Sequence, residues 1–373
     1  MRGEDTRRYP PEGWHVLGLM SGTSLDGLDV ASVRVLRDSQ RQAWSCTLEA
    51  FATLPYPQEL RNELWHSMSL SAEALAALDV AWSCWVSDAV KDWMSRIHLS
   101  PVDLLSSHGH TVFHRPEAGW TVQLGCGATL HARMGVPVVC NLRRLDVALG
   151  GQGAPLVPLA DRELFGDWDV ALNLGGFANL SMEREGLGRV AWDVGSANLL
   201  LNLLVKTQGL EMDRDGVLAK SGAVLPVLLD AWKALPFHEK SPPKSLGREW
   251  LEAEVWPLAE GALKTQSLED VLATAVEYTS WAVVRDIPDG SKVLVTGGGA
   301  HNPALMDSLR LAGEDRGITW HVPDKTLVDG KEALVFAWLG LLRWLELPNA
   351  LPSVTGASRA SVGGALWGPG PRG

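Results

Sequence analysis

The sequence predicts an α/β protein with two domains, and three observations support that prediction. Short runs of β-forming residues alternate with helical patterns along the chain. Four glycine-rich turns each follow such a run, so each is expected where a strand ends and a tight turn begins. A strand, a glycine turn and a second strand occur near residue 20 and again near residue 175, which indicates an internal duplication.

Length and composition are those of a globular protein that is not built to bind nucleic acid. The chain has 373 residues, enough for two domains of ordinary size. A hydrophobic content of 46% and a charged content of 21% provide a core and an ordinary surface. The net charge of -11, with no run of lysine or arginine, argues against a nucleic-acid surface but is compatible with a local basic pocket for phosphate.

Cysteine usage and apolar segments point to the cytoplasm. The four cysteines show no C-x-x-C spacing, so we expect free thiols in a reducing compartment. The N-terminal residues are charged and lack the apolar segment of a signal peptide. The apolar stretch 333–345 contains Arg343 and is too short to span a membrane. We therefore predict a cytoplasmic protein without membrane contact.

Hydrophobic periodicity predicts the order of the elements. In the first half we expect a hairpin of strands 15–20 and 29–36 around the loop 21–27, helices 60–70 and 72–98, and buried strands 102–107 and 136–141. In the second half we expect strands at 170–174 and near Leu180, a helix at 197–206, a loop at 235–247, a helix at 267–284, a strand at 292–296 and a helix at 331–345. The strand 102–107 is expected to deliver His108-Gly-His110 at its end.

The four glycine turns suggest a cleft that holds a nucleoside triphosphate and a second substrate. Glycine lets backbone N–H groups approach a ligand closely and point at its oxygens. The first turn would bind phosphate through N–H groups and hydroxyls of Ser21, Gly22, Thr23, Ser24 and Gly27. Asp26 is the candidate ligand of Mg²⁺, directly or through water. The alternative is a hairpin turn in which Ser and Thr cap their own backbone.

Two later turns would complete the nucleotide site. Asn173, Gly175 and Gly176 would face the phosphates from the other side of the cleft, or form a bulge without a ligand. Residues Gly297-Gly298-Gly299, with Asn302 close behind, would pack against adenine and ribose, where a side chain would clash. A glycine cluster at a strand-to-helix join is the alternative for this last turn.

Several charged side chains are candidates for chemistry. Asp193 follows a strand and precedes a glycine turn, so it is a functional acid, the N-cap of the next helix, or both. Arg143 and Arg144 can bind a carboxylate, and we expect at least one of them to face solvent or a neighbouring Asp. Lys331 and Glu332 are expected in the solvated first turn of the last long helix.

Three histidines do not form a convincing metal site. His108, His110 and His114 have a spacing that is unusual for zinc, and no cysteine supports them. We interpret His110 as a residue of the second substrate's pocket and His108 as a hydrogen-bonded core histidine.

Seven motifs together resemble the anhydro-N-acetylmuramic acid kinase family. They occur in order between about residues 16 and 366 and are long enough to be specific. They are Gly18-Leu-Met-Ser-Gly-Thr-Ser-Leu-Asp-Gly-Leu-Asp29, His108-Gly-His-Thr-Val-Phe-His114, Gly150-Gly-Gln-Gly-Ala-Pro-Leu-Val-Pro158, Asn173-Leu-Gly-Gly-Phe-Ala-Asn-Leu180, Pro242-Pro-Lys-Ser-Leu-Gly-Arg-Glu249, Gly297-Gly-Gly-Ala-His-Asn-Pro303 and Leu351-Pro-Ser-Val-Thr-Gly-Ala357.

The resemblance implies a fold and a reaction. The fold is the two-domain, ribonuclease H-like fold of sugar kinases, heat-shock ATPases and actin, with nucleotide and sugar in a cleft between the domains. ATP and water would convert 1,6-anhydro-N-acetylmuramic acid to N-acetylmuramic acid 6-phosphate and ADP, with Mg²⁺, in bacterial cell-wall recycling and amino-sugar catabolism. The family usually forms homodimers.

The resemblance also assigns roles. Asp193 becomes the general base that takes a proton from water, as in an inverting glycosidase. The sugar site would comprise His110, Arg143, Arg144, Gly195 and Asn198. We place domain I at 13–130 with 350–373, carrying the first phosphate loop and part of the sugar site. Domain II, at 131–349, would carry the second phosphate loop, the base and the adenosine site, with a continuous hinge between the domains.

The chain departs from the family pattern around the proposed base. Asp193 is retained, but Val194, Ser196 and Asn202 replace the usual Thr, Pro and Asp, and Asn141 replaces an Asp. His110 stands where the family has Gln. These changes bear on sugar specificity and rate. They leave open a kinase for another anhydro sugar such as levoglucosan, and a nucleotide-binding regulator with weak catalysis. A more distant alternative is an ATPase that needs no sugar.

Overall fold

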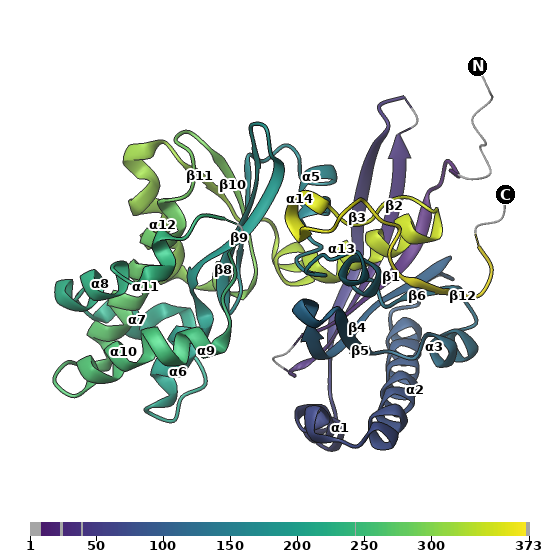
Figure 1. Ribbon diagram of the computed structural model, residues 1–373, viewed down its shortest axis with the longest axis horizontal. Coiled ribbons are helices and arrows are strands. Elements are labelled where there is room, and N and C mark those ends of the chain that lie inside the picture. The colour runs from purple at the N-terminus through teal and green to yellow at the C-terminus, as the bar shows by residue number, and fades with distance from the viewer. Residues whose placement is uncertain (1–8, 23–24, 39, 243, 371–373) are drawn as a thin grey trace. The chain divides into compact units, whose positions relative to one another are not determined.

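The protein is a mixed α/β structure with two sheets, which confirms the predicted fold class. The computed structural model describes residues 9–22, 25–38, 40–242 and 244–370 (Figure 1). The chain divides into two compact units: unit 1 is Met1–Leu164 with Gly330–Gly373, and unit 2 is Phe165–Asp329. Within the described ranges, no helix is long and apolar enough to cross a membrane.

Unit 1 combines long antiparallel strands with helices from both ends of the chain. Its strands are β1 (Trp14–Ser21), β2 (Gly27–Asp38), β3 (Ala43–Pro55), β4 (Leu104–Arg115), β5 (Trp120–Leu124), β6 (Val138–Cys140) and β12 (Ala365–Trp367). Its helices are α1 (Gln58–Trp65), α2 (Ala72–Arg96), α3 (Gly127–Met134), α4 (Arg144–Ala148), α5 (Pro158–Glu163), α14 (Pro352–Thr355) and most of α13 (Lys325–Trp344).

Unit 2 is a smaller sheet with more helices. Its strands are β7 (Val170–Leu174), β8 (Phe177–Arg184), β9 (Gly188–Ser196), β10 (Lys292–Thr296) and β11 (Thr319–His321). Its helices are α6 (Asn198–Lys206), α7 (Val217–Ser221), α8 (Pro226–Lys233), α9 (Arg248–Trp250), α10 (Trp256–Leu263), α11 (Leu268–Val284) and α12 (Pro303–Gly313). A 3₁₀ turn, Pro236–Glu239, lies inside the segment predicted to be a loop.

The two sheets repeat one topology, which confirms the predicted duplication. Unit 1 has the order β12-β6-β4-β1-β2-β3, with β5 paired to β4, and unit 2 has the order β11-β10-β7-β8-β9. In each unit the first strand pairs antiparallel with the second and parallel with a later strand. Each unit therefore presents one glycine turn where its first strand passes to its second.

The boundaries between the units differ from those expected from sequence. The chain passes from one unit to the other between Leu164 and Phe165 and again between Asp329 and Gly330. The sequence had predicted these boundaries at 130/131 and 349/350. Two contributions to the first sheet explain the shift. Strand β6 pairs in parallel with β4 and thereby assigns the residues after 130 to unit 1. Helix α13 packs on β1, so its residues from Gly330 onward also belong there.

Strand β1 is buried on both faces, which explains a glycine of the first motif. Leu17 and Leu19 point into a core that includes Trp82 of α2. Gly18 points to the opposite face, where a Cβ would collide with the backbone of Ala333 and the side chain of Ala337 in α13. Close approach of the helix to the strand therefore requires glycine here, independently of any ligand.

The core of unit 2 lies between its sheet and the long helix α11. Leu172 of β7, Leu180 of β8 and Trp192 of β9 are at most 3% exposed and belong to one cluster with α11 residues such as Val276. Ser267 begins α11 by accepting a hydrogen bond from the N–H of Asp270, an N-cap consistent with the predicted start of this helix.

Strand β4 is longer than predicted. The expected strand 102–107 would have ended just before His108, but β4 continues to Arg115 and pairs with β5. Gly109 has a φ of +78°, and a Cβ there would collide with the carbonyl of Leu124. The strand therefore passes His108 and His110 without ending, because Gly109 accommodates the distortion between them.

Lys331 does not lie in a solvated first turn. Helix α13 begins at Lys325, so Lys331 is inside the helix and is 5% exposed. Its Nζ lies 2.7 Å from a carboxylate oxygen of Asp161 in α5, which is 3% exposed. This buried ion pair links the two segments of unit 1 close to the points where the chain leaves the unit, after Leu164, and re-enters it, at Gly330. Glu332, the next residue, is exposed, but it too lies inside the helix and not in the predicted first turn.

Replacing Lys331 should destabilise the protein strongly. Lys331→Met leaves the Asp161 carboxylate buried without its counter-charge, which typically lowers the free energy of unfolding by about 3–5 kcal/mol. Urea unfolding of both proteins measures the difference. Lys220→Met is the control, because the Lys220–Asp307 pair is about half exposed and should contribute about 0–1 kcal/mol. Equal losses in the two variants would contradict the importance of burial.

Candidate active site

Asp193 lies on the face of the second sheet opposite to the one that packs Leu172, Leu180 and Trp192 into the core. Asn173 of β7 is directly opposite Asn179 of β8, and Asn179 is directly opposite Asp193 of β9. Directly opposed residues share a face, so these three side chains form one row. All three are half-buried, whereas the residues beside them in sequence, such as Leu174 and Ala178, are in the core.

A bulge after Asp193 sets the direction of the following residues. The pairing with β8 skips one residue between Asp193 and Gly195, so Val194 is the extra residue and is 1% exposed. Gly195 then faces α11, where a Cβ would lie 3.0 Å from Ala282. Gly195, which was expected in the sugar site, is thus accounted for by close packing between strand and helix.

The Asp193 carboxyl group is held by the loop after Lys244. Its Oδ2 accepts a 2.7 Å hydrogen bond from the N–H of Leu246, and its own N–H donates to the Lys244 carbonyl at 3.0 Å. Burial raises the pKa of Asp193 to about 6, and the Leu246 hydrogen bond partly opposes that shift. The group is therefore mostly ionised at pH 7, yet remains basic enough to accept a proton.

Asp193 is not the N-cap of the following helix. Helix α6 has Ala197 at its N-cap, without a side-chain cap. Its first N–H groups donate to the second glycine turn instead: Asn198 to the Gly175 carbonyl, at 3.2 Å, and Leu199 to the Gly176 carbonyl, at 3.1 Å. The capping alternative is excluded, which leaves the Asp193 carboxylate available for chemistry.

The second glycine turn is oriented to receive an anion. Because the Gly175 carbonyl points at α6, the N–H of Gly176 across the same trans peptide plane points the opposite way. Gly176 is exposed, and a Cβ there would meet only Leu199, at 3.6 Å. This outward N–H is the kind of donor that binds phosphate oxygens.

The third of the predicted nucleotide turns, Gly297–Gly299, packs tightly on the end of β7. Gly297 has a φ of +83°, and a Cβ there would lie 2.5 Å from Oδ1 of Asn173 and 2.9 Å from the Leu174 carbonyl carbon. A Cβ at Gly299 would lie 2.7 Å from the Leu174 side chain, whereas Gly298 is exposed. Close contact with β7 explains why residues 297 and 299 are glycines. Of the three glycines in this turn, Gly298 is the one that faces outward.

The two neighbouring asparagines support this turn. Asn198 donates from Nδ2 to the Leu174 carbonyl at 3.1 Å, and its Oδ1 lies beside Gly299. Asn198 thus lies at the Gly297–Gly299 turn, although the resemblance assigned it to the sugar site. Asn302 is the N-cap of α12 and accepts from the N–H groups of Ala304 and Leu305. Its side chain is therefore occupied in holding the helix start.

In unit 1, Ser21 joins two buried side chains in a short hydrogen-bond chain. The Tyr56 hydroxyl donates to Ser21 Oγ at 2.7 Å, and Ser21 Oγ lies 3.0 Å from Nδ1 of His110. Burial lowers the pKa of His110 to about 4 and raises that of Tyr56 to about 12, so both are neutral at pH 7. Ser21 then donates to Nδ1, which leaves an N–H on Nε2 of His110 for a ligand.

The rest of the first turn is only partly described. Thr23 and Ser24 lie outside the described residues. Gly22 is half-buried, and Gly27 is needed for strand pairing, because a Cβ there would lie 2.6 Å from the Leu54 carbonyl. Asp26 is exposed, and its Oδ1 accepts from the N–H of Gly27 at 3.2 Å.

The two arginines have different environments. Arg143 donates from Nε to Nε2 of His108 at 2.8 Å and from Nη1 to the Gly153 carbonyl at 2.6 Å. Burial lowers the pKa of Arg143 to about 10, against the opposing charges of Glu332 and Asp146, so it remains charged. Arg144 is exposed and its charge acts on Asp79, as expected for one of the pair.

The three histidines have separate partners. His108 accepts from Arg143 and donates from Nδ1 to the Gly109 carbonyl at 2.8 Å, as expected for a core histidine. His110 bonds Ser21, and His114 bonds the Thr121 hydroxyl at 3.0 Å. All four cysteines are free thiols, as predicted.

Sequence reasoning missed three residues that shape the site. Tyr56 carries no local signal, because only the fold brings it to Ser21. Asp146 is 1% exposed and holds the glycine loop after residue 149, accepting from the Gly153 N–H at 2.7 Å and the Thr355 hydroxyl at 2.7 Å. Asn179 was detectable, because it ends the motif that begins at Asn173 and a hairpin pairs the two.

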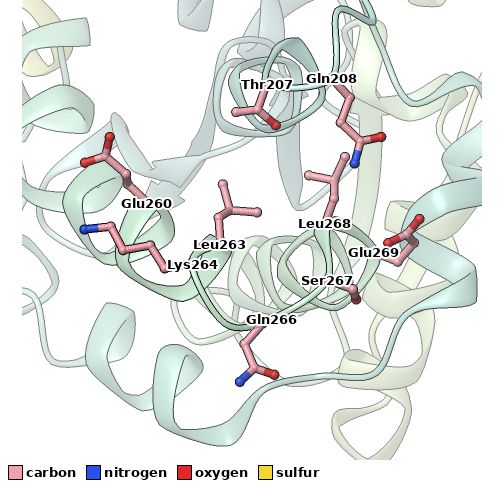
Figure 2. A pocket seen from close by; sticks show the side chains of 9 residues that line it. All are labelled: Thr207, Gln208, Glu260, Leu263, Lys264, Gln266, Ser267, Leu268 and Glu269. Carbon is pink, nitrogen blue, oxygen red and sulfur yellow. The ribbon is translucent and has the colours of Figure 1, made fainter.

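A separate pocket lies away from these residues. Figure 2 shows nine residues around it, from the end of α6, from α10 and from the start of α11, and its volume is about 670 Å³. None of the predicted site residues lines it. Asn198 begins α6 and the pocket contacts Thr207 just after its end, so the whole helix, on the order of 12 Å, separates the pocket from the glycine turns.

Comparison with known proteins identifies relatives along the whole chain. The family model described as anhydro-N-acetylmuramic acid kinase matches residues 14–369. A curated protein of Acaryochloris marina (strain MBIC 11017), anhydro-N-acetylmuramic acid kinase, is 36% identical over 382 residues, which cover 94% of this chain and 99% of that protein.

Solved structures show a looser likeness. The activator of the 2-hydroxyisocaproyl-CoA dehydratase from Clostridium difficile, with bound ADPNP, is 10% identical, covers 88% of this chain and 95% of its own, and has a TM-score of 0.43. The (R)-2-hydroxyglutaryl-CoA dehydratase component A of Acidaminococcus fermentans is also 10% identical, covers 87% and 96%, and has a TM-score of 0.42.

Asp193→Asn should stabilise the protein in a pH-dependent way. The fold raises the pKa from 3.8 to about 6, so ionisation of Asp193 destabilises the fold as the pH rises through that value. A neutral Asn avoids this, and the gain at pH 8 should exceed that at pH 4 by about 2 kcal/mol. Urea unfolding at both pH values measures the difference.

The matched control is Asp270→Asn. The N–H of Ala223 and the Ser267 hydroxyl lower the pKa of Asp270, so its ionised form stabilises the fold. That variant should lose more stability at pH 8 than at low pH. A gain from Asp193→Asn that is the same at both pH values would show that burial does not raise the pKa of Asp193.

Proposed function

Because the chain belongs to the anhydro-N-acetylmuramic acid kinase family, we propose that it is an ATP-dependent kinase of an anhydro sugar. It would open 1,6-anhydro-N-acetylmuramic acid with water and phosphorylate O6. The products are N-acetylmuramic acid 6-phosphate and ADP. As the resemblance implies, we further propose that it acts as a homodimer in the cytoplasm, in cell-wall recycling.

The position of Asp193 is the observation that carries this proposal. The carboxylate lies in the row with Asn173 and Asn179, beside the glycine turn whose Gly176 N–H points outward. A proton acceptor next to an anion-binding turn suits a reaction that joins attack by water to phosphoryl transfer. A pKa of about 6 keeps Asp193 ready to accept a proton at neutral pH.

The reaction needs one base and no separate acid. Water attacks the anomeric carbon, the bond from that carbon to the bridging oxygen breaks, and the bridging oxygen leaves as O6. Asp193 accepts the proton lost by the water. The γ-phosphoryl group of ATP bonds to O6 as the bond to ADP breaks, so it takes the place of the proton that a general acid would supply.

The phosphate groups would be bound by the glycine turns. Gly176 offers an outward N–H and Gly298 an exposed backbone, while Ser21 and Gly22 end the first strand of unit 1. Asp26, an exposed carboxylate after that strand, has the oxygen chemistry that Mg²⁺ prefers. Bound Mg²⁺ would supply neutralisation of charge on the phosphate oxygens.

The sugar would be recognised by unit 1 side chains with fixed roles. His110 is neutral and held by Ser21, so its Nε2 hydrogen is a donor to a sugar oxygen. Arg144 is exposed and charged, which suits the lactyl carboxylate of a muramic acid. Arg143 is held by His108 and Gly153, and it contributes a buried positive charge nearby.

The substitutions around the base are compatible with this function. Val194 is in the core, 1% exposed, so a methyl group there replaces a hydroxyl that would not face the substrate. Ser196 is fully buried, and its carbonyl accepts from the Thr279 hydroxyl at 2.9 Å. Asn202 is half-buried in α6, beyond the turn that binds the helix start.

The direct test is ADP release by the purified protein with Mg-ATP. The sugars compared are 1,6-anhydro-N-acetylmuramic acid, levoglucosan and none. We expect release that depends on the muramic sugar, with a 6-phosphate product. A preference for levoglucosan would show that levoglucosan, and not the muramic sugar, is the substrate. Nucleotide binding without turnover of either sugar would favour a regulator. Release without any sugar would indicate a simple ATPase.

Asp193→Asn should abolish turnover and keep nucleotide binding. Loss of a positioned base lowers kcat by about 10²- to 10⁴-fold, while the glycine turns that bind ATP keep their backbone. Steady-state kinetics and the Kd for ATP in the absence of sugar measure the two effects. Turnover close to that of the wild type would remove Asp193 from the role of base.

Arg144→Ala should impair only the sugar that carries a lactyl group. Loss of a charge-assisted hydrogen bond lowers kcat/KM by about ten- to a hundredfold for 1,6-anhydro-N-acetylmuramic acid. Any turnover of levoglucosan, which lacks the carboxylate, should be unchanged. Arg96→Ala is the control, because Arg96 is exposed and pairs with Asp92 of its own helix. An equal loss on both sugars would contradict carboxylate recognition.

A further inference from the structure

Asn179 is the closest polar neighbour of Asp193 across the sheet. The register pairs the two residues directly, so their Cβ atoms are about 4.5–5.5 Å apart and on the same face. Both side chains are half-buried, and the next row on this face consists of Ala171, Ser181 and Ala191. On strand β8, the Asn179 side chain therefore provides the amide that can reach the Asp193 carboxylate.

Both groups have unused hydrogen-bonding capacity. The Asp193 carboxylate has its Oδ2 bound to the Leu246 N–H, while its Oδ1 has no hydrogen bond to any described residue. The side-chain amide of Asn179 likewise makes no hydrogen bond within the described part of the chain. Ser181, two residues along β8, is different, because its hydroxyl is occupied by Arg189 at 2.8 Å.

A base that is fixed at only one oxygen can rotate. The Leu246 N–H holds Oδ2, but rotation of the carboxylate about that contact moves Oδ1 and its lone pairs away from a substrate water. A second donor at Oδ1 would stop this rotation and favour the ionised form. Hydrogen bonds at catalytic groups are commonly long before substrate binds and shorten in the complex.

We propose that Asn179 is a positioning residue for Asp193, donating from Nδ2 to Oδ1 when the sugar and ATP are bound. It acts through the base and not on the substrate. Two donors, the Leu246 backbone and the Asn179 side chain, then fix the carboxylate plane from two sides. This inference rests on the proposed function, because it assumes that Asp193 is the base.

Asn173 provides a built-in comparison. It lies in the same row but two strands from Asp193, about 10 Å away. Its Oδ1 adjoins Gly297 of the nucleotide turn. The two asparagines share a residue type, a face and a degree of burial, and differ in which group they neighbour. Replacing Asn173 should therefore affect the binding of ATP, and replacing Asn179 should affect the ionisation and orientation of Asp193.

The experiment measures kcat and both KM values from pH 5 to pH 9 for the wild type, Asn179→Ala, Asn179→Asp and Asn173→Ala. In Asn179→Ala, kcat should fall about 10²-fold with little change in either KM. The acid limb of its pH profile should move up by about one pH unit, because the ionised base has lost a donor. Asn179→Asp should move the limb further, since a second carboxylate disfavours ionisation.

Asn173→Ala should raise the KM for ATP and leave the acid limb in place. The pH profile separates positioning from folding, because a merely structural loss lowers activity without moving the limb. An unchanged limb in both Asn179 variants, or a raised KM for ATP with normal kcat in Asn179→Ala, would overturn the proposal. If Asn179→Ala fails to fold, Asn179→Asp alone tests the proposal, through the position of the acid limb of its pH profile.

The wild-type measurement keeps the two proposals apart. If the wild type shows no sugar-dependent ADP release, the proposed function itself fails. If the wild type turns over and Asn179→Ala has the same kcat and the same profile, only the role of Asn179 is lost.

Discussion

The register of the antiparallel ladder β7–β8–β9 is the constraint on which the candidate site depends. Because side chains alternate between the two faces of a strand, burial of Leu172, Leu180 and Trp192 against α11 decides which residues face outward. A slip of one residue would bury Asp193 and expose the core. Hydrophobic burial, which is worth about 25 cal/mol per Å² of apolar surface, therefore holds Asp193 in place as firmly as it holds the core.

The glycines of the chain serve packing as well as ligand access. Gly18 lets α13 lie on β1, and Gly195 lets α11 lie on the end of β9. Gly297 lets the third turn rest on Asn173. Among the glycines of the second and third turns, Gly175–Gly176 and Gly297–Gly299, only Gly176 and Gly298 are exposed. A glycine-rich motif thus mixes two demands, close approach of elements and open N–H groups, and the sequence pattern does not separate them.

Much of the fold was predictable, and the errors have a common physical cause. The hairpin of β1 and β2, strand β7 and helix α11 follow from local periodicity and turn chemistry. The extension of β4 past His108, the burial of Lys331 and the unit boundaries were not predicted. Each depends on a partner distant in sequence: β5 for β4, Asp161 for Lys331, and the packing of α13 on β1 for the boundary. Of the candidate site, Asp193 was found from its motif, whereas Tyr56 and Asp146 have no local signal.

The sequence by itself determined the element order, the duplicated strand–turn–strand unit and the family, and it singled out Asp193 as the candidate acid. These features depend on short-range patterns, in which each residue and its neighbours carry the information. Tertiary structure alone decided that Gly195 serves packing, that Ala197 rather than Asp193 begins α6, and that Asn179 lies beside Asp193. Those assignments depend on register, burial and desolvation, which arise only when residues distant in the chain exclude water together.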